Sequence, residues 1–166
     1  VSIGPNLVPN ASFEEVEGAC PRGWRWDARN TDSTMRVVTE EARPGRTAVE
    51  IRNGTPFGAH VYGWFGTLEP IAVRPGVAYT LSAYVRCVDE TIAWFGGGPG
   101  WTLRVLLPNT HGRWELVSRA FTTAEDQTEF PLMVVSESPT AGFALAGLCL
   151  REGARPWGLC VQLYTL

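Results

Sequence analysis

The sequence predicts an all-β protein, a jelly-roll β-sandwich of two antiparallel sheets. Apolar and polar residues alternate over 48–52, 79–86 and 103–107, and such alternation is typical of strands that bury one face. No segment keeps an apolar period of 3.6 residues, which an amphipathic helix would need. About nine or ten short strands, separated by regularly spaced turn signals, indicate a sandwich or jelly roll.

The stretch over 75–88, PGVAYTLSAYVRCV, is the strongest of these strands. It begins at the turn signal Pro75-Gly76. Its apolar face, which must be buried, carries Tyr79, Leu81, Ala83 and Val85, and its other face carries Thr80, Ser82, Tyr84 and Arg86. A strand places successive side chains on opposite faces. The second face is either an ordinary solvated surface or a recognition surface.

The remaining elements follow in chain order. Residues 6–15 predict a short edge strand broken by a proline, and Trp24 and Trp26 share one face if their segment is extended. WFGGGPGW at 94–101 is expected to be a glycine-rich loop, and a phosphate-binding role is disfavoured because no GK[ST] motif follows. Further strands are expected at 35–39, 48–52, 59–65, 71–73, 103–107, 114–121, 130–135 and 143–150.

Length and composition limit the function classes. The 166 residues suit one domain with a single core. The net charge of −3 argues against a nucleic-acid partner, which needs clustered positive charge. No apolar run approaches the roughly 20 residues of a membrane-spanning helix. All basic residues are arginine, which excludes lysine-based catalysis.

The four cysteines, at 20, 87, 149 and 160, allow three pairings. The chain begins with Val1 rather than methionine, so a mature or excised piece of an exported protein is expected, and such a domain is expected to hold at least one disulfide. The apolar surroundings of Cys87 and Cys149 suit free buried thiols equally well. Both readings stay open.

Six segments, in order along the chain, resemble the carbohydrate-binding modules of families 4, 9, 16 and 22, which share the galactose-binding-like jelly roll. The matching segments are NLVPNASFEE at 6–15, PRGW at 21–24, GRTAVEI at 45–51, PGVAYTLSAYVR at 75–86, RWELVSRAFTT at 113–123 and GLCLREG at 147–153. The resemblance implies a module over residues 1–153. Residues 154–166 are then an exit linker and a final strand that closes this domain or opens a following one.

The resemblance also implies a sugar site on the concave face of one sheet or in loops at its edge. Aromatic rings stack on the C–H faces of pyranoses, and arginines hydrogen-bond their hydroxyls. Residues of these types stand at Arg25, Phe57, Trp64, Tyr84, Arg86, Trp94, Trp101 and Arg104. Arg25 follows Trp24, as a ligand-contacting arginine does in family 22, and Arg104 is expected on the same side as Arg86. Each of these residues could instead have an ordinary structural role. Phe57 could anchor its loop, Arg86 and Arg104 could be plain surface charges, and Trp24 and Trp114 suit the core.

The fold often carries a structural calcium held by oxygen ligands. Glu14 matches the N-terminal ligand of the family, but Ala146 stands where the family has its closing aspartate. Loss of that carboxylate weakens the site. The resemblance therefore allows a structural calcium without favouring it, and no cofactor is expected to be required.

Three functions compete. The first is a non-catalytic, extracellular module, secreted or at the cell surface, that tethers an attached hydrolase or lyase to a polysaccharide. The second is an enzyme, but glycosidases need two paired carboxylates, and the acidic residues here fall mainly in turns and termini. The third is a spacer or adhesion domain that keeps the fold without binding sugar.

Overall fold

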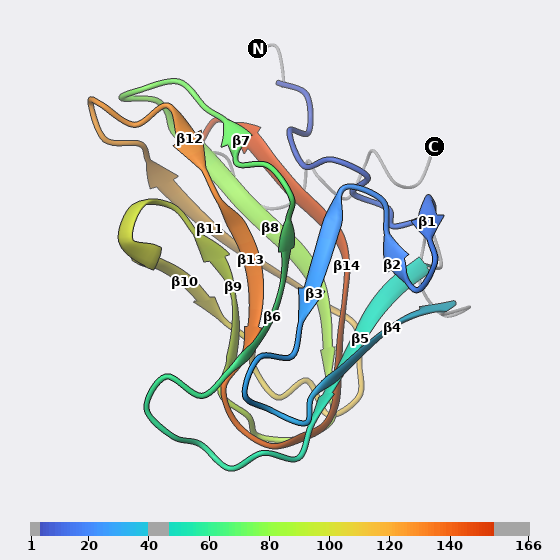
Figure 1. Ribbon diagram of the computed structural model, residues 1–166. Helices are drawn as coiled ribbons and strands as arrows, with labels where there is room; N and C mark the ends of the chain where they lie inside the picture. Colours follow the sequence, from blue (N-terminus) through green and yellow to red (C-terminus); the bar gives the residue numbers. More distant parts are fainter. Residues whose placement is uncertain (1–3, 40–46, 155–166) are drawn as a thin grey trace.

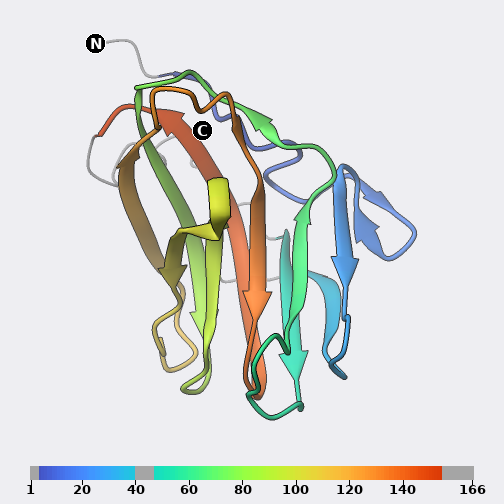
Figure 2. The same cartoon turned by 60° about the vertical axis from the view of Figure 1, so that its left-hand side comes forward.

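The structure, a computed structural model, describes residues 4–39 and 47–154. Two five-stranded antiparallel sheets face each other as the layers of a sandwich (Figure 1 and Figure 2). The predicted all-β jelly-roll sandwich is confirmed. Sheet I has the order β10 (Leu103–Leu106), β9 (Ala93–Gly97), β13 (Leu132–Ser136), β6 (Gly63–Thr67) and β3 (Trp24–Asp27). Sheet II has the order β11 (Glu115–Thr122), β8 (Ala78–Cys87), β14 (Thr140–Glu152), β5 (Thr47–Asn53) and β4 (Thr34–Thr39).

Two short ribbons and one helical turn complete the described elements. One ribbon pairs β1 (Val16–Glu17) with β2 (Cys20–Pro21), and the other pairs β7 (Ile71–Ala72) with β12 (Glu129–Phe130). The 3₁₀ turn η1 (Pro99–Trp101) follows β9. No helix in the described ranges is long and apolar enough to span a membrane.

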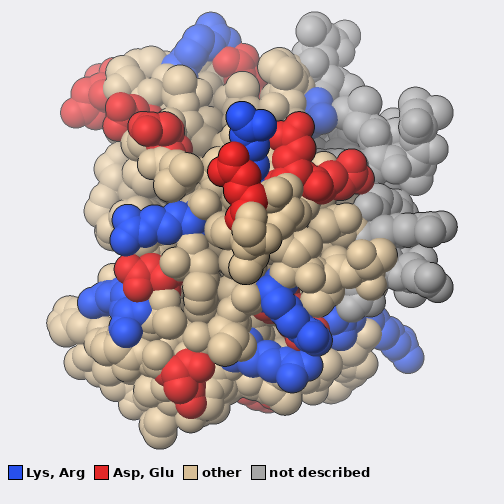
Figure 3. Space-filling view, turned by 45° about the vertical axis from the view of Figure 1, so that its right-hand side comes forward, with Lys and Arg blue, Asp and Glu red and all other residues tan. Residues whose placement is uncertain are grey.

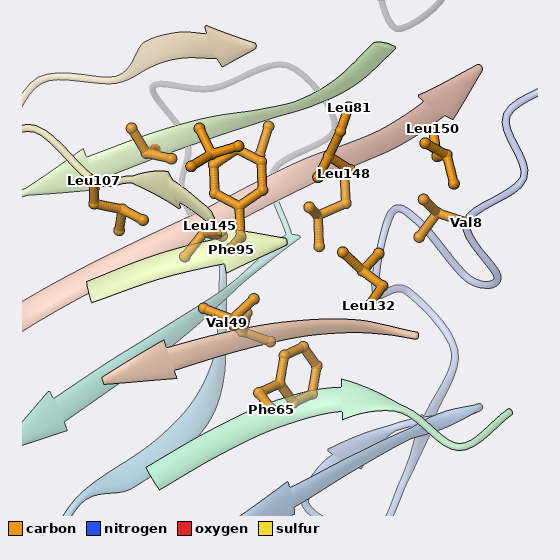
Figure 4. Packing of buried hydrophobic residues seen from close by; sticks show 14 of the residues in the cluster. Val8, Val49, Phe65, Leu81, Phe95, Leu107, Leu132, Leu145, Leu148 and Leu150 are labelled. Atoms are coloured by element: carbon orange, nitrogen blue, oxygen red, sulfur yellow. The ribbon is translucent and has the colours of Figure 1, made fainter. Parts of the chain in front are cut away.

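The core fills the space between the two sheets. The apolar face of β8 is fully buried there, as the alternation predicts, through Tyr79, Leu81, Ala83 and Val85. Figure 4 shows Phe65, Phe95 and Leu132 of sheet I and Leu145 of sheet II pointing into this space. Trp24 also belongs to the core, with its ring stacked on that of Phe65 at a centroid distance of 4.6 Å. The core interpretation of Trp24 is therefore confirmed.

The predicted edge strand over 6–15 is wrong. Asn10 and Phe13 both have a positive φ, which turns the chain and breaks an extended conformation. The segment is held differently: Asn6 donates its side-chain amide to the carbonyl of Leu148 (3.0 Å) and accepts from the backbone N–H of Leu150 (3.1 Å). These side-chain bonds and one backbone bond, from the N–H of Leu7 to the carbonyl of Leu150 (2.9 Å), thus replace a strand ladder.

The glycine-rich segment over 94–101 is a strand for half its length, not a loop. β9 lies between β10 and β13, and Gly96 and Gly97 have φ values of 151° and 144°. A Cβ at Gly96 would collide with the carbonyl oxygen of Leu103, and one at Gly97 with that of Pro131. Glycine is needed here for close backbone approach rather than for a turn.

Three cysteines lie in the described residues, Cys20, Cys87 and Cys149, and no disulfide joins any two of them. Burial raises the pKa of the Cys87 thiol and also that of the Cys20 thiol. The described part of the chain therefore gives no support to a disulfide among these three. Cys160 and the predicted strand over 159–166 lie outside the described residues.

Candidate functional site

The outer face of sheet I carries two rows of side chains that run across its five strands. Residues directly paired on neighbouring strands point to the same face. The first row is Asp27, Trp64, Val135, Trp94 and Leu106. The second row is Arg25, Gly66, Met133, Gly96 and Arg104. Two indoles thus flank the centre of the first row, and two arginines end the second.

A cavity of about 590 Å³ lies over these rows. The predicted site residues in its lining are Trp64, Trp94, Trp101 and Arg104. The other lining residues are His60, Tyr62, Thr67, Leu68, Pro70, Pro131, Leu132, Met133, Val135 and Glu137. Four residues chosen from the sequence therefore meet in one place, although they come from β6, β9, η1 and β10.

Two glycines lie beside Met133, one of the residues that line the cavity. Gly66 and Gly96 stand on either side of Met133 in the second row, so the surface is low there. A Cβ at Gly66 would lie 3.0 Å from Cζ3 of Trp64. The six-membered ring of Trp64 therefore lies against the backbone of Gly66.

Trp94 forms part of the floor and holds two charged neighbours. Its side chain is only 4% exposed, and its Nε1–H donates to Oε2 of Glu137 at 3.3 Å. The guanidinium carbon of Arg104 lies 4.9 Å from the centroid of the Trp94 ring. Trp94 has too little free surface to stack on a ligand. It can instead fix Arg104 and Glu137, a cation and an anion, in the cavity wall.

Trp101 is the accessible aromatic residue of this wall. It is 38% exposed and has a φ of +56°, an uncommon conformation for a bulky residue. The Nε of Arg104 donates to the carbonyl oxygen of Trp101 at 3.1 Å. Non-glycine residues held at positive φ tend to cluster at functional sites. The backbone thus presents an indole at the mouth of the cavity.

At the opposite end of the rows, arginines again lie over aromatic rings, as Arg104 does over Trp94. The guanidinium carbon of Arg25 lies 5.2 Å from the Trp64 ring centroid, and that of Arg29 lies 3.9 Å from the Tyr62 ring. Arg25 also forms an ion pair with Asp27 at 3.5 Å. Arg25 is thus next to the cavity through Trp64, without being part of its lining.

Tyr84 and Arg86 do not join this site. β8 belongs to sheet II, so both side chains lie on the far side of the core from the cavity. Nη2 of Arg86 lies 3.4 Å from Oε2 of Glu50, and its guanidinium carbon lies 5.5 Å from the ring of the half-buried Trp114. The expectation that Arg104 and Arg86 face the same side is wrong, because the two residues belong to different sheets.

Phe57 is 62% exposed and does not line the cavity. Its loop contributes other residues, however. The side-chain amide of Asn30 donates to the carbonyl of His60 (3.1 Å) and its oxygen accepts from the N–H of Tyr62 (3.3 Å). These bonds fix His60 and Tyr62 at the cavity.

Glu14, the expected calcium ligand, is exposed, and Ala146 is buried opposite Tyr84 in sheet II. Within residues 4–39 and 47–154, no group of three or more histidine, cysteine, aspartate or glutamate side chains could hold a metal ion. The structural calcium stays a prediction that the resemblance allows.

No family model matches the sequence, and no curated protein matches it. The fold, in contrast, has several solved counterparts. The enzymatically active domain of tailspike protein 4 of bacteriophage CBA120 is 14% identical with a TM-score of 0.66, over 89% of this chain and 21% of that one. A family 16 carbohydrate-binding module is 17% identical with a TM-score of 0.61, over 87% of this chain and 99% of the module.

The CBM22-1 xylan-binding domain of Xyn10C from Paenibacillus barcinonensis gives a similar result. It is 18% identical with a TM-score of 0.58, over 94% of this chain and 99% of that domain. At these identities the likeness concerns the fold. The chain has the jelly-roll fold of these carbohydrate-binding modules, over nearly its whole length.

Proposed function

We propose that this chain is a non-catalytic carbohydrate-binding module that binds a poly- or oligosaccharide in the cavity of sheet I. One observation carries the proposal: Trp101, Arg104 and Glu137 meet around one cavity, with a half-exposed indole beside a cation and an anion. Ligand sites are typically apolar hollows with a few placed polar groups. The fold of the carbohydrate-binding modules agrees with this function.

The chemistry of the three side chains suits a pyranose. The indole face of Trp101 can stack on sugar C–H groups. Arg104 donates its Nε–H to a backbone carbonyl and forms no ion pair with a described carboxylate, which leaves its two Nη groups for hydroxyls. Glu137 offers acceptor oxygens for the same hydroxyls. The ring of Trp64 adds apolar surface toward Arg25.

The cavity is less suited to glycoside hydrolysis. Glycosidases act with two carboxyl groups on opposite sides of the scissile bond. Glu137 is the one carboxylate among the described residues that line the cavity. Asp27 lies nearby but accepts from the N–H of Arg29 at 2.8 Å and pairs with Arg25. These contacts favour binding over catalysis.

We further infer that the module acts outside the cell and brings an attached glycan-active catalytic domain to its polysaccharide. The xylan-binding domain of Xyn10C and the phage tailspike show this fold in sugar-binding and enzymatic proteins. The competing function is a spacer or adhesion domain that keeps the fold without a working sugar site.

A panel of neutral polysaccharides tested by affinity gel electrophoresis distinguishes the two functions. The wild-type chain is expected to be retarded by at least one of them. Arg104→Gln removes the Nη donors with little change in size, so it should weaken that retardation by about tenfold or more. Retention of full affinity by Arg104→Gln would place the sugar elsewhere, and no retardation by any polysaccharide would favour the spacer.

A further inference from the structure

The outer face of sheet II, on the other side of the core from the cavity, carries a charged row of its own. Arg36 on β4, Glu50 on β5, Ala144 on β14 and Arg86 on β8 are paired directly across four strands. They therefore point to the same face. The small, buried side chain of Ala144 leaves room for Arg86 and Glu50 to meet across β14, at 3.4 Å.

Two further arginines contact the same carboxylate. Oε1 of Glu50 accepts from Nε and Nη2 of Arg36, at 2.9 and 2.8 Å, and from Nε of Arg52 at 3.1 Å. The Glu50 side chain is only 10% exposed, whereas those of Arg36 and Arg52 are 61% and 57% exposed. The carboxylate is thus buried beneath two guanidinium groups that reach solvent.

The charges of the described residues at this position do not balance. Among the described residues, Glu50 is the one carboxylate that forms an ion pair with Arg36 or Arg52. One negative charge faces two positive charges, even when Arg86 is left out. On the side of the molecule turned forward in Figure 3, blue side chains lie close together below the centre, with little red at the surface between them.

This arrangement is suited to an anionic ligand. Arg52 uses only its Nε on Glu50, so its Nη groups can donate to another oxyanion. Guanidinium groups recognise planar carboxylates and tetrahedral oxyanions through paired donors. An added anion would also offset the repulsion between Arg36 and Arg52, which share one oxygen of Glu50.

We propose that Arg36, Glu50 and Arg52 form a second binding site, which takes a carboxylate or sulfate group of an acidic polysaccharide. We choose a polysaccharide over a nucleic acid because the fold is the one seen in carbohydrate-binding modules. That the polymer is a polysaccharide rests on the proposed function. The need for an anion rests on Arg36 and Arg52 alone.

The test compares polymers that differ only in charge. Polygalacturonate, its methyl ester and dextran sulfate are titrated into the full chain by calorimetry, at low and at moderate salt. The wild type is expected to bind polygalacturonate or dextran sulfate, more weakly as salt rises, and the methyl ester at least about tenfold less tightly. The preferred polymer identifies the anion as carboxylate or sulfate. Equal binding of the methyl ester, or no binding of either acidic polymer, would overturn the proposal.

The variant that probes the site is Arg36→Gln with Arg52→Gln. The matched control, Arg22→Gln with Arg119→Gln, removes two exposed charges elsewhere on the molecule. The double variant at Arg36 and Arg52 should lose about tenfold or more in affinity for the acidic polymer. The control double variant should lose about twofold or less. Arg52→Gln alone leaves Glu50 paired with Arg36, so it keeps the test decisive if the double variant does not fold. This single variant should lose about threefold in affinity for the acidic polymer.

Two controls separate this site from the cavity and from a simple anion site. Arg104→Gln should weaken binding of neutral polysaccharides and leave that of the acidic polymer unchanged. If Arg104→Gln weakens both, the acidic chain binds in the cavity and the second site is wrong. Sodium sulfate at the same charge concentration should protect against thermal unfolding less than the polymer does. Equal protection would show a small-anion site and overturn the assignment to a polysaccharide.

Discussion

The guanidinium carbon of Arg104 lies 4.9 Å from the ring centroid of Trp94, whose own side chain is 4% exposed. The same indole donates its N–H to Glu137. Trp94 therefore acts between two charged residues that a sugar could reach, and has almost no surface of its own for stacking. Its part in the site is to position Arg104 and Glu137.

Two substitutions at Trp94 separate these roles. Trp94→Phe keeps a ring beneath Arg104 but removes the hydrogen bond to Glu137, so sugar affinity should fall by about three- to tenfold with a small loss of stability. Trp94→Ala leaves a cavity beneath Arg104 and should cost about 3–5 kcal/mol in the free energy of unfolding. Calorimetric titration and urea unfolding measure the two quantities. An unchanged affinity in Trp94→Phe would show that Glu137 does not need the indole N–H.

Gly96→Ala tests the close backbone approach within sheet I. Its Cβ would collide with the carbonyl oxygen of Leu103, at a φ that L-residues rarely adopt. The free energy of unfolding should fall by about 1–3 kcal/mol or more. Gly4→Ala is the control, because its Cβ would lie at an ordinary 3.5 Å from Cβ of Glu152. Equal stability of the two variants in urea would mean that β9 can move away from β10.

The two faces of β8 should respond differently to truncation. Leu81 is fully buried between the sheets, so Leu81→Ala should cost about 2–5 kcal/mol of stability. Tyr84 lies on the outer face of sheet II, away from the cavity. Tyr84→Ala should therefore leave the affinity for neutral sugars unchanged, as measured by gel retardation. A tenfold loss of affinity in a folded Tyr84→Ala chain would place the sugar on sheet II.

Much of the fold could be predicted from the alternation of residues, because the period of two fixes which side chains share a face. It does not fix the sheet to which a strand belongs. Tyr84 and Trp64 both look like outward aromatic residues in the sequence, yet they lie on opposite sides of the core. The pairing that separates them joins residues far apart in the chain, and no local pattern reveals it.

The missed residues have the same explanation. Glu137 resembles any acidic residue near a turn, and its role depends on a contact with Trp94, which is distant in the sequence. Gly96 and Gly97 resemble a loop because glycines usually mark turns. Here they serve the close packing of three strands. Trp101 and Arg104 could be predicted as site residues from their residue types. The positive φ of Trp101, which accompanies its exposed indole, could not be predicted.

Acid should weaken the charged row of sheet II through Glu50. Burial alone would raise the pKa of this carboxyl, but the hydrogen bond from Arg36 and the charges of Arg36, Arg52 and Arg86 outweigh it and hold the pKa below its usual value. A depressed folded-state pKa contributes stability above the unfolded value of about 4.3, which is lost as the pH falls through the folded pKa.

Unfolding in urea at several pH values checks this effect. The wild type should be more stable than Glu50→Gln at pH 7, and the difference between them should shrink as the pH falls from about 5 to about 3. A difference that stays constant over this range would show that Glu50 does not depend on its charge.

The most direct test of the sugar site compares two exposed aromatic residues, one inside the cavity and one outside it. Trp101 lines the cavity and Phe57 does not, and both are accessible to solvent. Calorimetric titration of Trp101→Ala and Phe57→Ala, with the polysaccharide that retards the wild type, should show a loss of about tenfold or more for the first and little change for the second. Equal affinity of Trp101→Ala and the wild type, or a loss confined to Phe57→Ala, would contradict a sugar site in the cavity of sheet I.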